Sequence, residues 1–472
     1  MNIKRSKLSI AVAIASAAIA GQAMALPANT VPDLEIWMSG ASAEDGMIQA
    51  LFTDLCADTP DVYLSNDATP GSSYRAISCT LDSTKVSGLS ITNPKVVFHK
   101  RSAGGSGMGV APVADATPIT QMVINNGNCS ASGNPNEYLC STSNPGDTIQ
   151  QVSDAGISDV EPALFVPPNV PSGFSATTPA QINKLQITSQ VGLVFGIPVT
   201  TALRDALQTA QGLTVGAEDE ANMPNLSKNQ VAALMTGGVG KWTSFTVNGT
   251  PLTAVAGVTA PADTKVHICR RVEGSGTQAQ MNANFLRVPC VNGAFLPKTS
   301  SNPILGPIVT LNSGAGDVDT CLDNDNAANN WSIGLQSLEK NYLVNGSYPK
   351  GYRFVKIDGA APSLKNAATN QYFDWAENSI QWLKASNGGP TGDKLVVLSK
   401  IATDAGKPSI VTSVNTKFHY SWGDSGYMSL NTNGWTPSVP FSAANPVATA
   451  THVLGSVNNC RVPQINKTAD MF

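Results

Sequence analysis

The chain is poor in charged residues and in aromatic residues. Of its 472 residues, 13% are charged and 6% are aromatic. The charged share is about half of the roughly 25% found in an ordinary soluble domain, so small polar residues and alanine must cover much of the surface. With a formal net charge of −4, the composition excludes a strongly basic nucleic-acid-binding protein, whereas 42% hydrophobic residues exclude a disordered chain.

The sequence also lacks any run of about 20 apolar residues, the length that a membrane-spanning helix needs. Its one long apolar run, residues 8–20, is too short. Three cations within residues 1–7 precede this run and Ala23–Ala25 follow it, which is the pattern of an export signal. We expect cleavage after Ala25, which makes the net charge more negative by three, and a periplasmic or secreted protein without membrane insertion or a nucleic-acid partner.

No Cys-x-x-Cys pair occurs and the four histidines are scattered, so neither a metal nor a cofactor is predicted. Eight cysteines in an exported protein favour disulfides. The sequence cannot choose among the possible pairings. Pairing sequence neighbours gives the expected bonds, which are Cys56–Cys79, Cys129–Cys140, Cys269–Cys290 and Cys321–Cys460.

Short apolar strands alternate with helical patterns, which predicts an α/β fold with largely parallel sheets. Three segments read as a strand that runs into a glycine-containing turn: residues 34–43, 95–107 and 265–277. Helices are predicted over residues 200–209, 227–237, 373–384 and 393–405, a strand over 352–357, and a disulfide-pinned surface loop over 129–147. The last 60 or so residues read only as irregular or β-rich.

Arg270 to Thr277 is the most informative segment. Glycines between a strand end and a helix start let backbone N–H groups converge, and the helix dipole favours negative charge there. Ser275 and Thr277 add hydroxyl groups, Arg271 offers a fork of donors, and Glu273 could hold that guanidinium. The segment predicts an oxyanion site.

Seven segments resemble, in the same order, motifs of the phosphate-binding proteins that serve ABC phosphate importers. In that family an Arg stands four residues before the Ser of Gly-Ser-Gly-Thr, as Arg271 does before Ser275. The other six segments are residues 39–43, 104–107, 156–159, 225–242, 331–334 and 357–363. Together they cover roughly residues 36 to 372 and leave the C-terminal hundred residues unexplained.

The resemblance implies a type II periplasmic-binding-protein fold, in which two α/β lobes joined by a hinge hold the ligand between them. Here the fold would carry disulfide-pinned insertions. The implied division is a signal peptide (1–25), the first part of lobe 1 (26–195), lobe 2 (196–345), and a return to lobe 1 with an unassigned C-terminal segment (346–472). The implied function is non-enzymatic capture of inorganic phosphate or a similar oxyanion for uptake, with an ABC importer permease as the possible partner.

Carried over position by position, the resemblance implies these ligand-binding residues: Ser42, Ala43, Glu44, Asp45, Ser106, Gly107, Asp159, Arg271, Ser275, Gly276 and Thr277. Asp159 has a specific role in this scheme. Its carboxylate repels a fully deprotonated anion but accepts a hydrogen bond from a P–OH group, and so selects protonated phosphate over sulfate.

The sequence departs from the family at Glu44 and Asp45, where the family has a hydroxyl residue and an aromatic residue. In one interpretation both carboxylates complement the start of the following helix, with Ser42 and Asp45 as a capping pair. In the other they fill or repel the anion site. The second interpretation leads to a different hypothesis, a secreted adhesion or complex-forming scaffold with a degenerate cleft.

Two further motifs are interpreted as structural. Gly423–Gly426 reproduces the Gly-Asp-Ser-Gly of trypsin-like proteases, but the match stops at Tyr427 and no histidine lies in a comparable context. Trp375 and Trp382 stand seven apart on the predicted helix over residues 373–384, which predicts core or inter-lobe packing for both rings.

Overall fold

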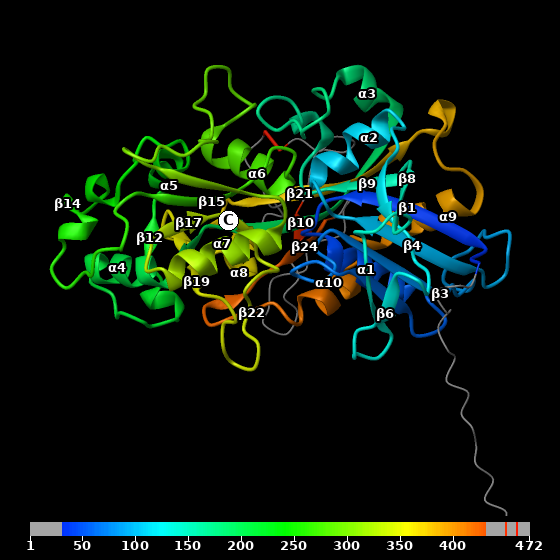
Figure 1. Ribbon diagram of the computed structural model, residues 1–472, viewed down its shortest axis with the longest axis horizontal. Helices are drawn as coiled ribbons and strands as arrows, with labels where there is room; N and C mark the ends of the chain where they lie inside the picture. The colour runs from blue at the N-terminus through cyan, green and yellow to red at the C-terminus, as the bar shows by residue number, and fades with distance from the viewer. Residues whose placement is uncertain (1–30, 431–448, 451–458, 461–472) are drawn as a thin grey trace, which may run out of the picture.

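A computed structural model describes residues 31–430, 449–450 and 459–460 of the chain. The expected signal peptide lies outside these residues. Figure 1 shows two lobes, with the strands around β1 in one and those around β15 in the other. Among the described residues, every helix is too short or too polar to cross a bilayer.

Lobe 1 is built on a twelve-stranded mixed sheet in the order β25-β24-β10-β21-β9-β1-β4-β3-β2-β7-β6, with β18 also paired to β10. Its strands are β1 (Leu34–Gly40), β2 (Asp61–Ser65), β3 (Tyr74–Thr80), β4 (Lys95–Arg101), β6 (Cys129–Ala131), β7 (Glu137–Cys140), β9 (Ala155–Ser158), β10 (Leu185–Gly196), β18 (Gln336–Ser337), β21 (Trp375–Leu383), β24 (Tyr427–Leu430) and β25 (Thr449–Ala450). β1 is parallel to β4 and β9, but β3, β10 and β21 run antiparallel to their neighbours. The expectation of largely parallel sheets is therefore wrong for this lobe.

Helices cover the lobe 1 sheet. α1 (Asp45–Asp54) packs against α9 (Gly392–Asp404) and α10 (Pro408–Asn415), and α9 also contacts β1. The buried face of α1 carries Met47, Ile48, Leu51 and Phe52, the helical spacing that the sequence shows. The two-stranded ladder of β5 (Ile119–Met122) and β8 (Thr148–Gln151) contacts β3 and β4, while α2 (Ala111–Ala114) and α3 (Pro179–Lys184) lie by β21 and β10.

Lobe 2 is built on a five-stranded sheet in the order β16-β15-β17-β11-β19. Its strands are β11 (Pro198–Thr200), β15 (His267–Arg271), β16 (Ile308–Asn312), β17 (Ser332–Gly334) and β19 (Tyr352–Phe354). Two small strand pairs also belong to this lobe: β12 (Asn225–Leu226) pairs with β20 (Lys356–Ile357), and β13 (Thr246–Val247) pairs with β14 (Thr250–Pro251). Its helices are α4 (Thr201–Gln211), α5 (Lys228–Met235), α6 (Gly276–Met281), α7 (Ala315–Ala327) and α8 (Leu364–Ala368). α7 packs along β15, β16 and β17.

The chain passes from lobe 1 to lobe 2 between β10 and β11, and it returns where β21 pairs antiparallel with β10. β18 touches the end of β10, but β19 pairs with β11 and β20 with β12, so the chain is in lobe 2 at residue 357. The structure thus places the return to lobe 1 at β21, beyond the expected boundary at residue 345.

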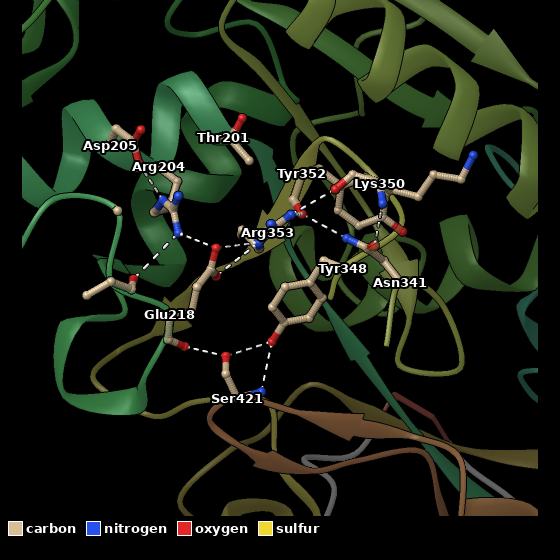
Figure 2. Close-up of polar contacts among 12 residues, drawn as sticks. Thr201, Arg204, Asp205, Glu218, Asn341, Tyr348, Lys350, Tyr352, Arg353 and Ser421 are labelled. Carbon is tan, nitrogen blue, oxygen red and sulfur yellow. Dashed lines mark hydrogen bonds and ion pairs between the residues drawn. The ribbon is translucent and has the colours of Figure 1, made fainter. Parts of the chain in front are cut away.

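The hairpin of β22 (His419–Tyr420) and β23 (Gly423–Asp424) then reaches back to lobe 2. Figure 2 shows the polar network that holds it there. Ser421 donates to the main-chain carbonyl of Glu218, and its hydroxyl lies 2.7 Å from the Tyr348 hydroxyl. The Glu218 carboxylate accepts from Arg353 Nε at 2.9 Å and pairs with Arg204 Nη1 at 3.1 Å. Segments far apart in the sequence thereby meet on lobe 2.

Several expected elements are confirmed. α4, α9, β1, β4 and β15 form where the patterns predict them, and α5 begins with the predicted capping box of Ser227 and Gln230. The helix expected over residues 373–384 is wrong, because this segment is strand β21. All nine residues of β21 are buried, and a strand buried on both faces does not show the alternation that identifies a half-exposed strand. Trp375 and Trp382 are an odd number of residues apart, so they point to opposite faces of that strand.

The predicted disulfides are half confirmed. Cys56–Cys79 and Cys129–Cys140 form as expected. The other two expected pairs are wrong, since the bonds are Cys269–Cys321 and Cys290–Cys460. Cys269 lies on β15 and Cys321 on α7, and α7 packs on β15, so the fold brings these two together. The α/β class and the disulfide-pinned segments are confirmed.

Candidate functional site

The turn between β15 and α6 has the predicted strand, glycine turn and helix order. Gly274 takes a φ of +89°, which favours glycine, and Ser275 caps α6 by accepting a hydrogen bond from the Gln278 N–H at 3.3 Å. Arg271 ends β15 and donates through Nη2 to the Ser313 carbonyl at 2.8 Å. All the polar side chains of this turn from Arg271 to Thr277, except Glu273, are buried.

The second predicted loop, from lobe 1, packs directly against this turn. The Gly107 N–H donates to the Gly274 carbonyl at 2.7 Å. The Asp159 N–H donates to Ser106 Oγ at 3.1 Å, so the loop and the end of β9 are fixed together. A Cβ on Gly276 would overlap Ser106 Oγ and would lie 2.8 Å from the Asp159 Cβ, which leaves room only for glycine. The structure therefore brings Ser106, Gly107, Asp159 and Gly276 together, as the sequence predicted.

Asp159 and Arg271 are the charged residues of this buried set, and they are 2% and 1% exposed. Thr277 Oγ1 donates to Asp159 Oδ2 at 3.1 Å. Among the residues that the structure describes, no group hydrogen-bonds Arg271 Nε or Asp159 Oδ1. An unpaired buried donor or acceptor costs roughly 1–3 kcal/mol, and more when it is charged. The set thus contains one donor and one acceptor that a small ligand could satisfy.

The two charges stabilise each other against burial. Burial raises the pKa of the Asp159 carboxyl, and the Arg271 charge opposes this. Burial also lowers the pKa of Arg271, and among the nearby charges Asp159 opposes this most. A guanidinium keeps its charge in proteins, so the set holds a fixed positive charge beside an acceptor.

In the first predicted loop, Asp45 lies in the first turn of α1, as the first interpretation of the two carboxylates predicts. The expected Ser42–Asp45 capping pair is wrong, because Glu44 is the N-cap residue of α1 and makes no side-chain cap hydrogen bond. The Asp45 carboxylate instead accepts from Ser102 Oγ at 2.7 Å and pairs with Lys100 Nζ at 3.1 Å and Arg75 Nη2 at 3.4 Å. Its charge is compensated within lobe 1.

Glu44 lies in the interior and is 1% exposed. Asn378 Nδ2 on β21 donates to its carboxyl group. Burial raises the pKa of Glu44 well above its ordinary value, and the Asp159 and Glu339 carboxyls raise it further. Its buried surroundings therefore favour the uncharged form of the Glu44 carboxyl beside the buried set. Ala43 lies next to it, and its carbonyl accepts from the Tyr427 hydroxyl.

Sequence reasoning missed Lys100 and Asn378, which contact the carboxyl groups of Asp45 and Glu44. Lys100 ends up buried because β4 is central, and its ammonium donates to the Gly40 and Ala41 carbonyls at 3.2 and 3.0 Å. The only sequence signal was a cation inside an apolar strand. Asn378 gave no signal, since its segment was predicted to be a helix.

Three other groups of polar side chains are structural. Ser425 Oγ is buried and donates to the Pro362 carbonyl, while the His419 ring is hydrogen-bonded to the Asp424 carboxylate. His267 pairs with Asp263 and Asp325 at 3.4 and 3.0 Å. Cys269, Cys321 and Asp325 lie close together, but a disulfide joins the two sulfurs, so they offer no thiolate to a metal.

A separate cleft opens between the lobes and measures about 430 Å³. Ser42 and Asp45 are the predicted residues that line it, with α1 and residues 69–75 on the lobe 1 side and the start of α7 on the lobe 2 side. Ser106, Asp159 and Arg271 do not line this cleft.

No family model and no curated protein matches the sequence. Among solved structures, the chain is similar to a putative phosphate ABC transporter substrate-binding protein with bound phosphate from Clostridium perfringens, at 12% identity and a TM-score of 0.42 over 82% of this chain and 98% of that one. It is also similar to PstS from Borrelia burgdorferi, at 12% identity and a TM-score of 0.35 over 80% of this chain and 96% of that one. The chain thus has distant structural similarity to both of these proteins.

Proposed function

We propose that the protein is an exported solute-binding protein that encloses a small oxyanion, inorganic phosphate, between its lobes. The observation that carries this proposal is the buried pair of unpaired atoms, Arg271 Nε and Asp159 Oδ1. Ser106 and Thr277, both hydrogen-bonded at Asp159, complete the set with hydroxyl groups.

A protonated phosphate satisfies both unpaired atoms at once. One of its charged oxygens accepts from Arg271 Nε, and its P–OH group donates to Asp159 Oδ1. Sulfate carries no such proton at neutral pH, so one of its anionic oxygens would face the anionic Asp159 Oδ1. Because the set is buried, each hydrogen bond is stronger there than in water.

Glu44 does not oppose this function. Burial raises the pKa of Glu44 and so favours its uncharged form beside Asp159, and the charge of Asp45 is compensated by Lys100 and Arg75. A protonated Glu44 carboxyl can also donate a hydrogen bond to an anionic oxygen. In this proposal the protein acts in the periplasm or outside the cell and delivers phosphate to an ABC importer permease, without covalent chemistry.

The test is isothermal titration of the mature protein with phosphate and, separately, with sulfate at pH 7. We expect phosphate to bind and sulfate not to bind, and Arg271→Gln to weaken phosphate binding at least about 100-fold, since a charge-assisted donor to a buried anion is lost. Arg353→Gln is the matched control, because Arg353 pairs with Glu218 away from the set. No heat and no melting shift with millimolar phosphate would refute the proposal.

One observation favours a second candidate, a secreted scaffold with a degenerate site. The Glu44 carboxyl, held by Asn378 and next to Asp159, could itself occupy the anion position. In that case the wild-type protein would bind no phosphate and Glu44→Thr would gain binding. Wild-type binding that survives unchanged in Glu44→Thr would exclude this candidate.

A further inference from the structure

The cleft of about 430 Å³ between the lobes is lined by an excess of positive charge. Arg75, Lys340 and Lys417 reach it from three separate segments, and Asp45 and Glu339 are the only carboxyl groups that line it. Such clustering is unexpected in a chain with 13% charged residues and a net charge of −4. Three cations that repel one another in one cleft need a compensating charge.

The carboxyl groups of the cleft provide only part of that charge. Asp45 is shared between Arg75 at 3.4 Å and the buried Lys100 at 3.1 Å. Glu339 lies 3.6 Å from Lys340 Nζ, and burial raises the pKa of its carboxyl group. Two carboxyl groups are thus divided among four cations.

One of the cations keeps a buried donor without an acceptor, and another has no carboxylate partner. Arg75 Nε is buried and has no hydrogen-bond partner among the described residues. Lys417 is an exposed residue, and over the same part of the chain no hydrogen bond or ion pair holds its ammonium, which lies 5.2 Å from the Phe418 ring centroid. Burial lowers the pKa of Lys417, the Glu339 carboxyl opposes this, and the charges of Arg75 and Lys340 lower the pKa further. An anion in the cleft would satisfy these donors.

The backbone around the cleft also suits an anion. Residues of the first turn of α1, Asp45 and Gly46, and of the first turn of α7, Ala315 and Gly316, line the cleft from opposite lobes. Their helix N-termini add partial positive charge. Gly46 carries no side chain, and Lys417 Nζ lies 3.7 Å from the point where a Cβ would be, so the ammonium sits over that turn.

We infer that this cleft is a second, separate site, which binds a small polyanion with two or more phosphoryl or carboxylate groups. A volume of about 430 Å³ is in the range of small-molecule sites and exceeds what a single phosphate needs. Several charges on one ligand match cations that come from both lobes. The inference does not depend on phosphate binding at Arg271.

The experiment is titration of the full mature protein with inorganic diphosphate at low ionic strength, pH 7. We expect wild-type binding, a loss of at least about tenfold in affinity in both Lys340→Gln and Lys417→Gln, and a marked weakening at high salt. Lys350→Gln is the matched control, since the Lys350 ammonium pairs with Asp323 at 3.2 Å and does not line the cleft. Arg271→Gln should also leave diphosphate affinity unchanged.

Three results would overturn the inference: no binding of millimolar diphosphate, binding that both lysine variants retain, or binding that is lost in Arg271→Gln. The last result would mean that diphosphate uses the buried set. Circular dichroism melting of each variant separates a loss of fold from a loss of affinity. If orthophosphate fails to bind while diphosphate binding depends on Lys340 and Lys417, the proposed function fails and this inference stands.

Discussion

At the scale of single residues, two buried carboxyl groups near β21 make stability depend on pH. Burial raises the pKa of Glu377 to about 7 and that of Asp374 to about 6, although Ser189 donates to Glu377 at 3.3 Å. At pH values between the ordinary pKa of these carboxyl groups and the raised one, the folded protein binds more protons than the unfolded chain. The free energy of unfolding must therefore fall as the pH rises through this window.

Glu377→Gln should remove part of that dependence. At pH 5 the wild-type carboxyl is protonated and the two proteins should have similar unfolding free energies. At pH 8 the variant should be more stable by ~3 kcal/mol, the magnitude that follows from a pKa raised by two to three units. Urea unfolding at pH 5, 6, 7 and 8 measures both curves. Parallel curves over the whole range would contradict the prediction.

The residues of the buried set were the most predictable part of the site. Ser106, Asp159, Arg271 and Thr277 stand in short motifs whose order indicates that they meet, and they do meet. The different positions of Glu44 and Asp45 could not be predicted. They depend on Lys100 and Asn378, which come from strands that only the folded sheet brings to the first loop.

At the scale of elements, α5 offers a clean test of local structure. Ser227 Oγ accepts from the Gln230 N–H at 3.1 Å, and the Gln230 side chain accepts from the Ser227 N–H at 2.8 Å. Ser227→Ala should lower the unfolding free energy by about 1 kcal/mol, whereas Ser227→Thr keeps the cap and should cost less. Urea unfolding of the three proteins at one pH measures the order, and equal losses in both variants would contradict it.

The strength of local signals explains which elements the sequence predicts. α5 is recognisable because its cap and apolar spacing are local features. β21 is not, because a central strand is defined by its neighbours β9 and β10, which lie far away in the sequence. The antiparallel hairpin of β2 and β3 similarly has no signal in the alternation of strands and helices that predicted parallel sheets.

At the scale of the whole molecule, one disulfide links the two lobes. Cys290 follows α6 in lobe 2 and is bonded to Cys460, a sequence separation of 170 residues. The adjacent Asn459 exchanges two hydrogen bonds with Glu161 of lobe 1, at 2.6 and 2.8 Å. Residues 459–460 therefore tie lobe 1 to lobe 2 outside the hinge strands.

Removing this tie should let the lobes move relative to each other. We expect the double variant Cys290→Ser/Cys460→Ser to melt at a lower temperature and to show a larger radius of gyration in small-angle X-ray scattering, because a long-range cross-link constrains the unfolded chain and the lobes. The matched control is Cys129→Ser/Cys140→Ser, whose bond closes a short hairpin within lobe 1. A radius of gyration that equals the wild-type value would contradict a role in holding the lobes.

The absent side chain of Gly276 gives experimental control over the distance between the lobes. Gly276 belongs to lobe 2, yet the space that its Cβ would need is taken by Ser106 and Asp159 of lobe 1. A single added methyl group would push the two lobes apart without replacing any charged residue. Gly276→Ala is thus a route to a form of the protein with separated lobes, and the arrangement of the wild-type lobes can be compared with it.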